Sequence, residues 1–468
     1  NSRERDKFQT IFGALTLKHN PNEKTELGLQ ASAFSSKEIE TYDITGEYWL
    51  GDATTENDNN QNALEIARYH EHARNRLSST IMNVGHYGSS KIKNNTLKWG
   101  ATVQMEKIND RISEWEKRDS AGYSLPQTGN GVNVISNLYS DNDLSTTRIS
   151  GYLQDVFKFR TKQGMFTLIG GIRGSYWSYN KEFIFSPRVS LGFIPNFDQN
   201  LTFRAATGIY YQSPFYKELR TTMQDAAGND IIELNKDIKS QRSIHFILGG
   251  DYTFRAADRN FKVSADLYYK KLDDLIPYTV DNVKIRYYGE NCAKGHAMGI
   301  DVKFFGEFVP GTDSWISFSL MKAEQTIRDM VTVPMPNSQG YNVSLFFQDY
   351  FPGYKRVKLN LKGVLSGGLP FIAPRTKYED VKSTFRTPAY KRVDLGFSYQ
   401  LAGGTDAIMD RGVFRHLKNI WIGVDVFNLF DIKNVSSYSW ITNIDNQQYA
   451  VPNYLTGRQL NARLIVDF

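Results

Sequence analysis

The last ten residues of the chain, Gln459–Phe468, alternate between apolar and polar side chains. Successive side chains of a β-strand point to opposite faces, so this pattern predicts a strand with one apolar and one polar wall. The apolar wall consists of Leu460, Ala462, Leu464, Val466 and Phe468, and the polar wall of Gln459, Asn461, Arg463 and Asp467, with Ile465 as the exception. A terminal aromatic on such a strand is typical of the last strand of a membrane β-barrel, apolar toward lipid and polar toward a lumen.

The same two-faced pattern recurs along the chain. Further strands are predicted around 97–106, 316–320, 357–365 and 393–401. Charged residues on the polar faces, such as Arg463, Lys358 and Glu106, favour a wet lumen and are expected to pair with one another or with a plug rather than bind substrate. The fold class predicted is an all-β, antiparallel transmembrane β-barrel.

Short and long connections between these strands also alternate. Tight turns are predicted near 20–22, 93–95, 161–163, 195–197, 257–259, 310–312 and 352–353, where Asn, Pro, Gly and Asp gather. Long polar loops are predicted at Lys37–Arg76, Asp110–Leu144, Pro214–Lys239, Asp273–Lys294, Ala323–Gly340, Gly367–Pro388 and Asp431–Tyr454. Outer-membrane barrels have short periplasmic turns and long extracellular loops. The stretch Ala402–Lys418 is an exception, because it is long for a periplasmic turn.

The strand count has a consequence for closure. We count about 17 strands, and the first (near Lys7–His19) and the last run in the same direction, which requires an odd number. Bacterial single-chain barrels have even numbers, and an open edge in lipid leaves backbone groups unpaired. We therefore expect the chain to be part of a barrel, with the missing strands supplied elsewhere.

Composition changes this picture little. The chain has 468 residues, 40% hydrophobic and 13% aromatic, without the run of about 18 apolar residues that a transmembrane helix needs. The net charge of +6 and the lack of a basic block do not favour a nucleic-acid partner. The single Cys292 excludes an internal disulfide, and the opening Asn1-Ser2-Arg3 carries no signal peptide, as expected of a mature protein or a piece of one.

Candidate catalytic and metal-binding chemistry is sparse. The one tight His/carboxylate group is His70-Glu71-His72, in a stretch, Ala63–Leu77, with some helical periodicity; two His residues two apart on a helix would diverge, so we predict no metal site there. Asp52, Glu56 and Asp58 lack the spacing of a calcium loop, and Asp273-Asp274 is expected to end a strand. We expect no cofactor and no enzymatic activity, although folding could bring Ser, His and Asp together as in barrel enzymes.

Aromatic residues near the predicted extracellular ends are the candidate ligand-binding residues, because amphipathic rings stack well on sugars, catecholates or peptide side chains. The alternative is that these rings form a membrane-interface belt. The ligand-binding candidates are Trp49, Trp115, Trp177, Tyr179, Phe215, Tyr216, Trp440 and Tyr449, with Tyr48, Tyr123 and Phe371 beside them. Leu460, Leu464, Val466 and Phe468 are the predicted assembly signal of the terminal strand.

Several motifs, in order, resemble the barrel of TonB-dependent outer-membrane receptors, especially those of Bacteroidetes. They are Val424-Asp425-Val426-Phe427-Asn428-Leu429-Phe430-Asp431, Gly457-Arg458, Ser186-Pro187-Arg188-Val189, Tyr211-Gln212-Ser213-Pro214, Gly368-Leu369-Pro370-Phe371 and the opening stretch Arg5–Asn22. The resemblance covers nearly the whole chain. It implies a barrel of about 22 strands, so that residues 1–468 would form about strand 6 to strand 22, with the N-terminal plug and first strands absent.

The resemblance also implies a function. Such a receptor, in the outer membrane, captures a scarce glycan, peptide or metal chelate on its loops and imports it when TonB, which contacts the missing N-terminal part, displaces the plug. A surface lipoprotein lid or other outer-membrane subunits are the further partners implied. The alternative is a passive channel, or a barrel that acts as a structural subunit of an outer-membrane complex. A soluble propeller is disfavoured because no repeat of about 40–50 residues is found.

Overall fold

A computed structural model describes residues 2–50, 64–119, 134–225, 230–281, 284–309, 312–351, 353–372, 384–403, 406, 412, 416–442 and 448–467. Within these residues nearly all of the backbone is β-strand, with a short 3₁₀ turn, η1 (Tyr216–Leu219), in one loop. Among the described residues, no helix has the length and apolar character needed to cross a membrane. The all-β class predicted from the alternating pattern is therefore confirmed.

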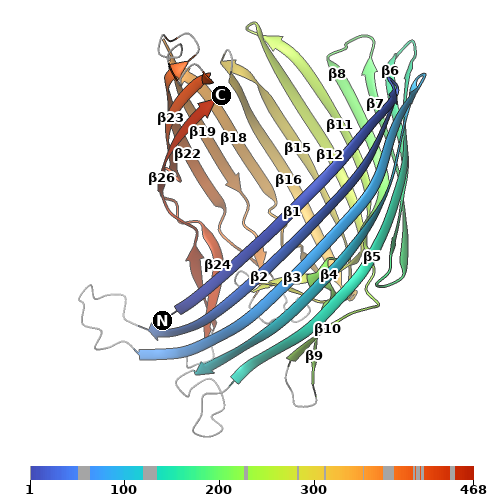
Figure 1. The fold of residues 1–468 in the computed structure, drawn as a ribbon. Helices are drawn as coiled ribbons and strands as arrows, with labels where there is room; N and C mark the ends of the chain where they lie inside the picture. The colour runs from blue at the N-terminus through green and yellow to red at the C-terminus, as the bar shows by residue number, and fades with distance from the viewer. Residues whose placement is uncertain are drawn as a thin grey trace.

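Within the described residues, seventeen long strands, each antiparallel to the next, form one curved wall (Figure 1). The count agrees with the number expected from the sequence. The strands are β1 (Ser2–Asn22), β2 (Thr25–Leu50), β3 (Leu64–Ile92), β4 (Asn95–Asp119), β5 (Val134–Arg160), β6 (Gly164–Trp177), β7 (Glu182–Pro195), β8 (Leu201–Gln212), β11 (Gln241–Ala256), β12 (Arg259–Leu275), β15 (Ala293–Val309), β16 (Thr312–Ile327), β18 (Tyr341–Phe351), β19 (Tyr354–Ser366), β22 (Tyr390–Gly403), β23 (Asn419–Phe427) and β26 (Gln459–Asp467).

Nine short strands belong to the connections at one end of this wall, which we call the loop end. They are β9 (Arg220–Gln224), β10 (Asp230–Leu234), β13 (Tyr278–Asp281), β14 (Lys284–Tyr287), β17 (Val331–Pro334), β20 (Pro370–Phe371), β21 (Phe385–Arg386), β24 (Val435–Thr442) and β25 (Gln448–Tyr454). The other end, which we call the turn end, has tight turns. At one of them Ala257 and Asp258 both adopt positive φ (50° and 60°), as a two-residue hairpin turn requires.

Two of the loops predicted from the sequence are shorter in the structure than expected. The predicted loops Lys37–Arg76 and Asp110–Leu144 are largely strand, because β2 continues to Leu50, β3 begins at Leu64, β4 continues to Asp119 and β5 begins at Val134. The stretch Ala63–Leu77, which has helical periodicity, belongs from Leu64 onward to β3. In these segments the regular alternation of apolar and polar side chains ends, although the backbone pairing continues. The connection after Gly403 is, as expected, the long one at the turn end.

The two faces of the wall differ in chemistry. On β4 the outward series Leu97, Trp99, Ala101, Val103 and Met105 spans about ten residues, about 25 Å along the axis of a tilted strand, which matches the apolar band of outer-membrane barrels. On β26, Leu460 and Leu464 are 76% and 66% exposed on the same outward face, which confirms the alternation predicted there.

Aromatic rings mark the turn-end border of this apolar band. Stacked ring contacts run along the outward face, next to the tight turns, through Phe157, Phe159, Phe166, Phe193 and Phe203, and again through Tyr252, Phe254, Phe261 and Phe304. Rings gather at the borders of the hydrocarbon layer because their apolar bodies and polarizable faces suit that interface. They mark the turn-end border of the membrane-spanning part.

The inward face carries charged side chains that pair with one another. Arg204 binds both Asp251 and Asp266, the latter at 2.9 Å. Arg463 reaches Asp425 at 3.3 Å and donates a hydrogen bond to the Ser398 hydroxyl at 2.8 Å. These ion pairs link neighbouring strands on the inward face. Charged side chains favour contact with water, so the inward face lines a water-filled lumen.

The wall has two free edges within the described residues. β1 pairs only with β2, and β26 pairs only with β23. Figure 1 shows β1 crossing the front of the view, with the N-terminus at the loop end and the C-terminus at the opposite, turn end. The first and last strands therefore run in the same direction, as the strand count requires.

Candidate functional site

A loop between β8 and β11, of which residues 213–225 and 230–240 are described and here called the docked loop, folds onto the inward face of β4 to β6. The carboxylate of Asp110 on β4 is 1% exposed; it accepts a hydrogen bond from the Tyr216 hydroxyl at 2.9 Å and forms an ion pair with Arg220 at 2.8 Å. β10 adds a short parallel pairing to β5, with Asp230 opposite Leu138. The loop thus crosses the neighbouring strands at the lumen mouth.

An apolar cluster lies beneath the docked loop. Its buried members are Ile108, Leu144, Trp177, Tyr216, Leu219, Ile238 and Ile276, from three wall strands and two loops. Trp177 is 2% exposed, and the Arg148 guanidinium lies 4.1 Å from its ring centroid. Arg148 also forms an ion pair with Glu106 at 3.3 Å and donates to the Pro214 carbonyl at 3.0 Å. Packing and charge together hold the loop against the wall.

The acidic groups under the docked loop are shifted by burial. Asp110 lies on β4 beyond the apolar band; desolvation raises its pKa, while Arg220 opposes the shift. Desolvation likewise raises the pKa of Glu218, which accepts hydrogen bonds from the Phe215 backbone amide at 3.1 Å and the Gln241 amide at 3.0 Å. Burial beside Asp110 also raises the pKa of Tyr216. Burial under the docked loop therefore makes each group harder to ionise, while the Asp110 carboxylate keeps its ion pair with Arg220.

A second loop packs against the first. The hairpin β13–β14 brings Tyr287 edge-on to Phe215, with ring centroids 5.3 Å apart. The Asn235 amide of the docked loop donates to the Gly289 carbonyl at 2.8 Å. Gly289 has φ +71°, and a Cβ there would lie 2.2 Å from the Arg220 carbonyl oxygen, so only glycine fits. Four predicted aromatics, Trp177, Tyr179, Phe215 and Tyr216, are thus brought together.

A second aromatic cluster gathers at the loop end from two other connections. The ring of Phe371 lies 4.6 Å from Tyr438, 5.8 Å from Phe385 and 6.2 Å from Trp440. Ile372, next in sequence, packs in a buried cluster with Ala293 and Ile327 on the inward side of β15 and β16. Phe371, Tyr438 and Trp440 are only half-buried and Phe385 is exposed, so this cluster, unlike the first, retains ring surface for a ligand.

The remaining predicted residues lie apart from these clusters. Trp115 is on the outward face of β4, where His72 stacks on its ring at 4.8 Å and His70 meets it edge-on at 4.9 Å. Trp49 and Tyr449 lie in β2 and β25, but their side chains, like Phe468, Tyr123, Asp52, Glu56 and Asp58, are outside the described part of the structure. The ligand and assembly roles assigned to all these residues stay predictions.

The His70-Glu71-His72 group is on a strand, not a helix, so both imidazoles share one face. His72 Nδ1 lies 2.6 Å from Asp43, whose second oxygen binds Arg74 at 2.6 Å. The hydrogen bond from Arg74, and then that from His72, lower the pKa of Asp43. Within the described ranges no group of three or more His, Cys, Asp or Glu side chains is arranged to hold a metal ion.

The lumen charges named from the sequence pair with wall residues rather than with one another. Arg463 pairs with Asp425 and Glu106 with Arg148, as described above. Lys358 places its ammonium group 4.6 Å from the Trp421 ring centroid and 5.1 Å from that of Tyr350. Because each charge already has a partner in the wall, these three residues line the passage without forming a pocket.

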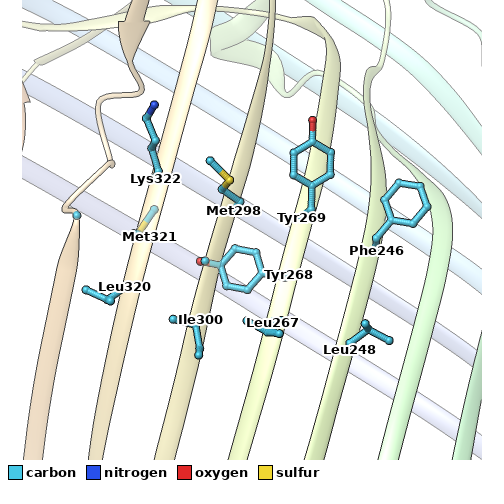
Figure 2. A pocket seen from close by; sticks show the side chains of 12 residues that line it. Phe246, Leu248, Leu267, Tyr268, Tyr269, Met298, Ile300, Leu320, Met321 and Lys322 are labelled. Atoms are coloured by element: carbon cyan, nitrogen blue, oxygen red, sulfur yellow. The ribbon is translucent and has the colours of Figure 1, made fainter.

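A groove of about 640 Å³ opens on the opposite, outward face, across β11, β12, β15 and β16. Figure 2 shows Phe246, Leu248, Leu267 and Met298 side by side along it. These side chains are exposed and apolar and lie within the band that faces acyl chains. The groove is therefore unsuited to a water-soluble ligand, and the loop-end clusters are the candidate site.

Sequence reasoning missed most residues that surround the predicted aromatics, among them Asp110, Arg220, Phe385 and Tyr438. Asp110 was placed at the start of a loop, yet it continues the inward register of Glu106 along β4, and that spacing of two was a usable signal. The other three lie in loops whose docking depends on contacts between segments far apart in the sequence. No local pattern marks such contacts.

Comparison with known proteins places this wall among membrane receptors. The family described as TonB dependent receptor-like, β-barrel, matches residues 1–429. The chain belongs to this family of TonB-dependent receptor barrels. The family predicted from the motifs is thereby confirmed. The narrower assignment to the Bacteroidetes type stays a prediction. A search of curated proteins gave no match.

Solved structures share the fold at low sequence identity. A mutant form of the ferric enterobactin receptor PfeA of Pseudomonas aeruginosa is 14% identical, with a TM-score of 0.53 over 99% of this chain and 69% of that one. The ferric-catecholate import receptor Fiu of E. coli K12 is 11% identical, with a TM-score of 0.60 over 98% and 64%. The RagAB peptide transporter is 11% identical, with a TM-score of 0.54 over 92% and 58%.

Proposed function

We propose that this chain is the wall of an outer-membrane receptor that imports a scarce ligand by a TonB-dependent step. The observation that carries the proposal is the two-faced wall: apolar outward, and lined inward with paired charges beneath loops that fold into the mouth. Such a wall encloses an aqueous passage, which must be plugged to prevent leakage. The role is transport and not catalysis, in keeping with the family.

The free edges of β1 and β26 support the proposal that the wall is part of a larger barrel. An edge strand in lipid leaves backbone amides and carbonyls unpaired, at several kcal/mol for each group. We propose that about five further strands join β1 to β26, which gives the even number typical of bacterial barrels, and that a plug fills the lumen and provides the contact with TonB.

The second aromatic cluster supports a ligand that presents rings or flat groups. Phe371, Phe385, Tyr438 and Trp440 offer half-exposed faces for stacking on catecholates, sugars or peptide side chains. The similar structures include receptors named for ferric enterobactin and ferric catecholates and a transporter named for peptides. We therefore propose metal chelates and peptides as the first ligands to test, with glycans next. A surface lipoprotein lid at the loop end, which the family resemblance implies, is a further proposal.

The test is uptake of labelled ligand by cells that carry the intact receptor, with and without TonB. We expect uptake to stop without TonB and to fall about tenfold in a Phe371→Ala, Trp440→Ala variant, which loses two stacking rings. Phe166→Ala, Phe193→Ala is the matched control, because these two stacked rings lie on the outward face at the turn end. Uptake that continues unchanged without TonB would contradict active import and favour the passive channel.

A further inference from the structure

Charges alternate in sign along the loop-end part of β1. Arg5 and Lys7 point outward, in register with the apolar Ile11 and Leu15, while Glu4 and Asp6 point inward. Because a strand has a side-chain period of two, this alternation separates the charges onto the two faces of the wall. Along this part of β1 the outward charges are therefore basic and the inward charges acidic.

The neighbouring strands repeat this separation. Ile39 of β2 pairs with Lys7 of β1 on one side and with Arg76 of β3 on the other. Lys37 is the next outward residue of β2 after Ile39. Adjacent strands lie about 4.8 Å apart, so Lys7 and Arg76 have backbones about 10 Å apart. Lys107 follows on the outward face of β4. We call Arg5, Lys7, Lys37, Arg76 and Lys107 the basic belt.

The basic belt directly adjoins the apolar band. On β4, Lys107 is the next outward residue after Met105, which is 55% exposed. On β1, Lys7 lies two outward positions beyond Ile11. The belt therefore stands where acyl chains give way to lipid headgroups. Long basic side chains at such borders extend their charged ends into the headgroup layer.

The belt carries charge that the wall does not neutralise. Arg74 and Arg111, also outward, are held by Asp43 at 2.6 Å and Asp141 at 3.2 Å. By contrast, no ion pair involves the five belt residues within the described part of the chain, and all five are exposed. Like charges on neighbouring strands are unfavourable without counterions, so the geometry calls for an anion outside the protein.

We propose that the basic belt binds the phosphate groups of lipids in the outer leaflet. The lipid source follows from position: the acyl chains of such a lipid lie against Leu15, Leu29 and Val84 while its phosphates meet Lys7, Lys37 and Arg76. Arg76 matches a phosphate with two parallel donors, and the lysines act as point charges. This inference depends on the membrane placement of the wall, not on the transport proposed above.

The test compares two variants of the intact receptor, each with four substitutions. The outward variant is Lys7→Gln, Lys37→Gln, Arg76→Gln, Lys107→Gln. The matched inward variant is Glu4→Gln, Asp6→Asn, Glu38→Gln, Glu40→Gln, which removes four charges from the other face of the same wall. Binding of lipid A, a diphosphorylated glycolipid, is measured by native mass spectrometry in mild detergent, beside its dephosphorylated form.

Each basic residue near an anionic headgroup contributes about fivefold to binding, so the outward variant should bind lipid A about two to three orders of magnitude more weakly. The inward variant should bind normally, and dephosphorylated lipid should bind weakly to all. Equal binding by the outward variant overturns the proposal, as does displacement of lipid A by an equal concentration of inorganic phosphate, which would mean an adventitious ion only. A charge-conserving variant (Lys7→Arg, Lys37→Arg, Arg76→Lys, Lys107→Arg) must keep binding, so that misfolding cannot mimic the result.

Discussion

Replacing Asp110 with alanine tests whether the docked loop is held by its buried ion pair. The carboxylate is almost fully buried and satisfies both the Arg220 guanidinium and the Tyr216 hydroxyl. Removing one partner of a buried pair costs about 3 to 5 kcal/mol, and the lower value applies because the Arg220 side chain retains 19% exposure. A loss of about 3 kcal/mol raises the undocked fraction more than a hundredfold.

The assay is hydrogen exchange of the backbone amides in the docked loop, read by mass spectrometry on the intact receptor in lipid nanodiscs. The short strand β10, which pairs with β5 of the wall at Asp230 and Ile231, reports docking. Asp110→Ala should speed its exchange by about two orders of magnitude. Asp143→Ala, an exposed carboxylate on the outward side of β5, is the control and should change nothing. Unchanged protection in Asp110→Ala would refute the reasoning.

The remaining predictions concern pH, backbone fit and membrane contact. Docking favours the protonated form of Glu218, because burial without a charged partner raises its pKa above the ordinary 4.5. Loop protection from this group should therefore increase as pH falls from neutral toward that value and decrease as pH rises, and intrinsically corrected exchange at pH 5 and pH 8 checks the sign. Gly289→Ala should release the docked loop from its neighbour, because the new Cβ meets the Arg220 carbonyl; faster exchange in both loops is expected, and normal exchange would contradict it. Leu464→Lys should cost about 2 to 4 kcal/mol on the lipid face and lower the amount of heat-modifiable barrel, whereas Ile465→Lys, on the lumen face, should be tolerated; equal losses would reverse the assigned faces.

The sequence predicted the membrane-spanning strands because lipid imposes a strict rule on one face. In β26, Leu460 and Leu464 face lipid and must be apolar, so the alternation of apolar and polar residues can be recognised in the sequence. Beyond the membrane that constraint disappears. After Lys37 in β2, polar and apolar side chains are mixed on both faces, so hydropathy no longer distinguishes strand from loop although pairing continues to Leu50. In β4, where Asp110 points inward and Arg111 outward, alternation of charge sign continues the strand pattern.

The candidate site was less predictable than the wall. Aromatic residues near the loop end were identified, but not which would be used for packing. Trp177 and Tyr216 are buried because the docked loop returns to the wall, and Phe371 and Trp440 keep free ring surface because their hairpins meet each other instead. Both outcomes depend on contacts between segments far apart in the chain, such as that of Tyr216 with Asp110.

The unequal strand lengths give the protein a slanted rim. β3 has 29 residues and β6 has 14, so one side of the wall extends about 50 Å farther along the strand than the other. On the low side, β6 and β7 are joined by only four residues, 178–181. The rim of the wall is therefore high along β2 to β5 and low at β6 and β7, so the mouth of the lumen opens toward the side of the short strands.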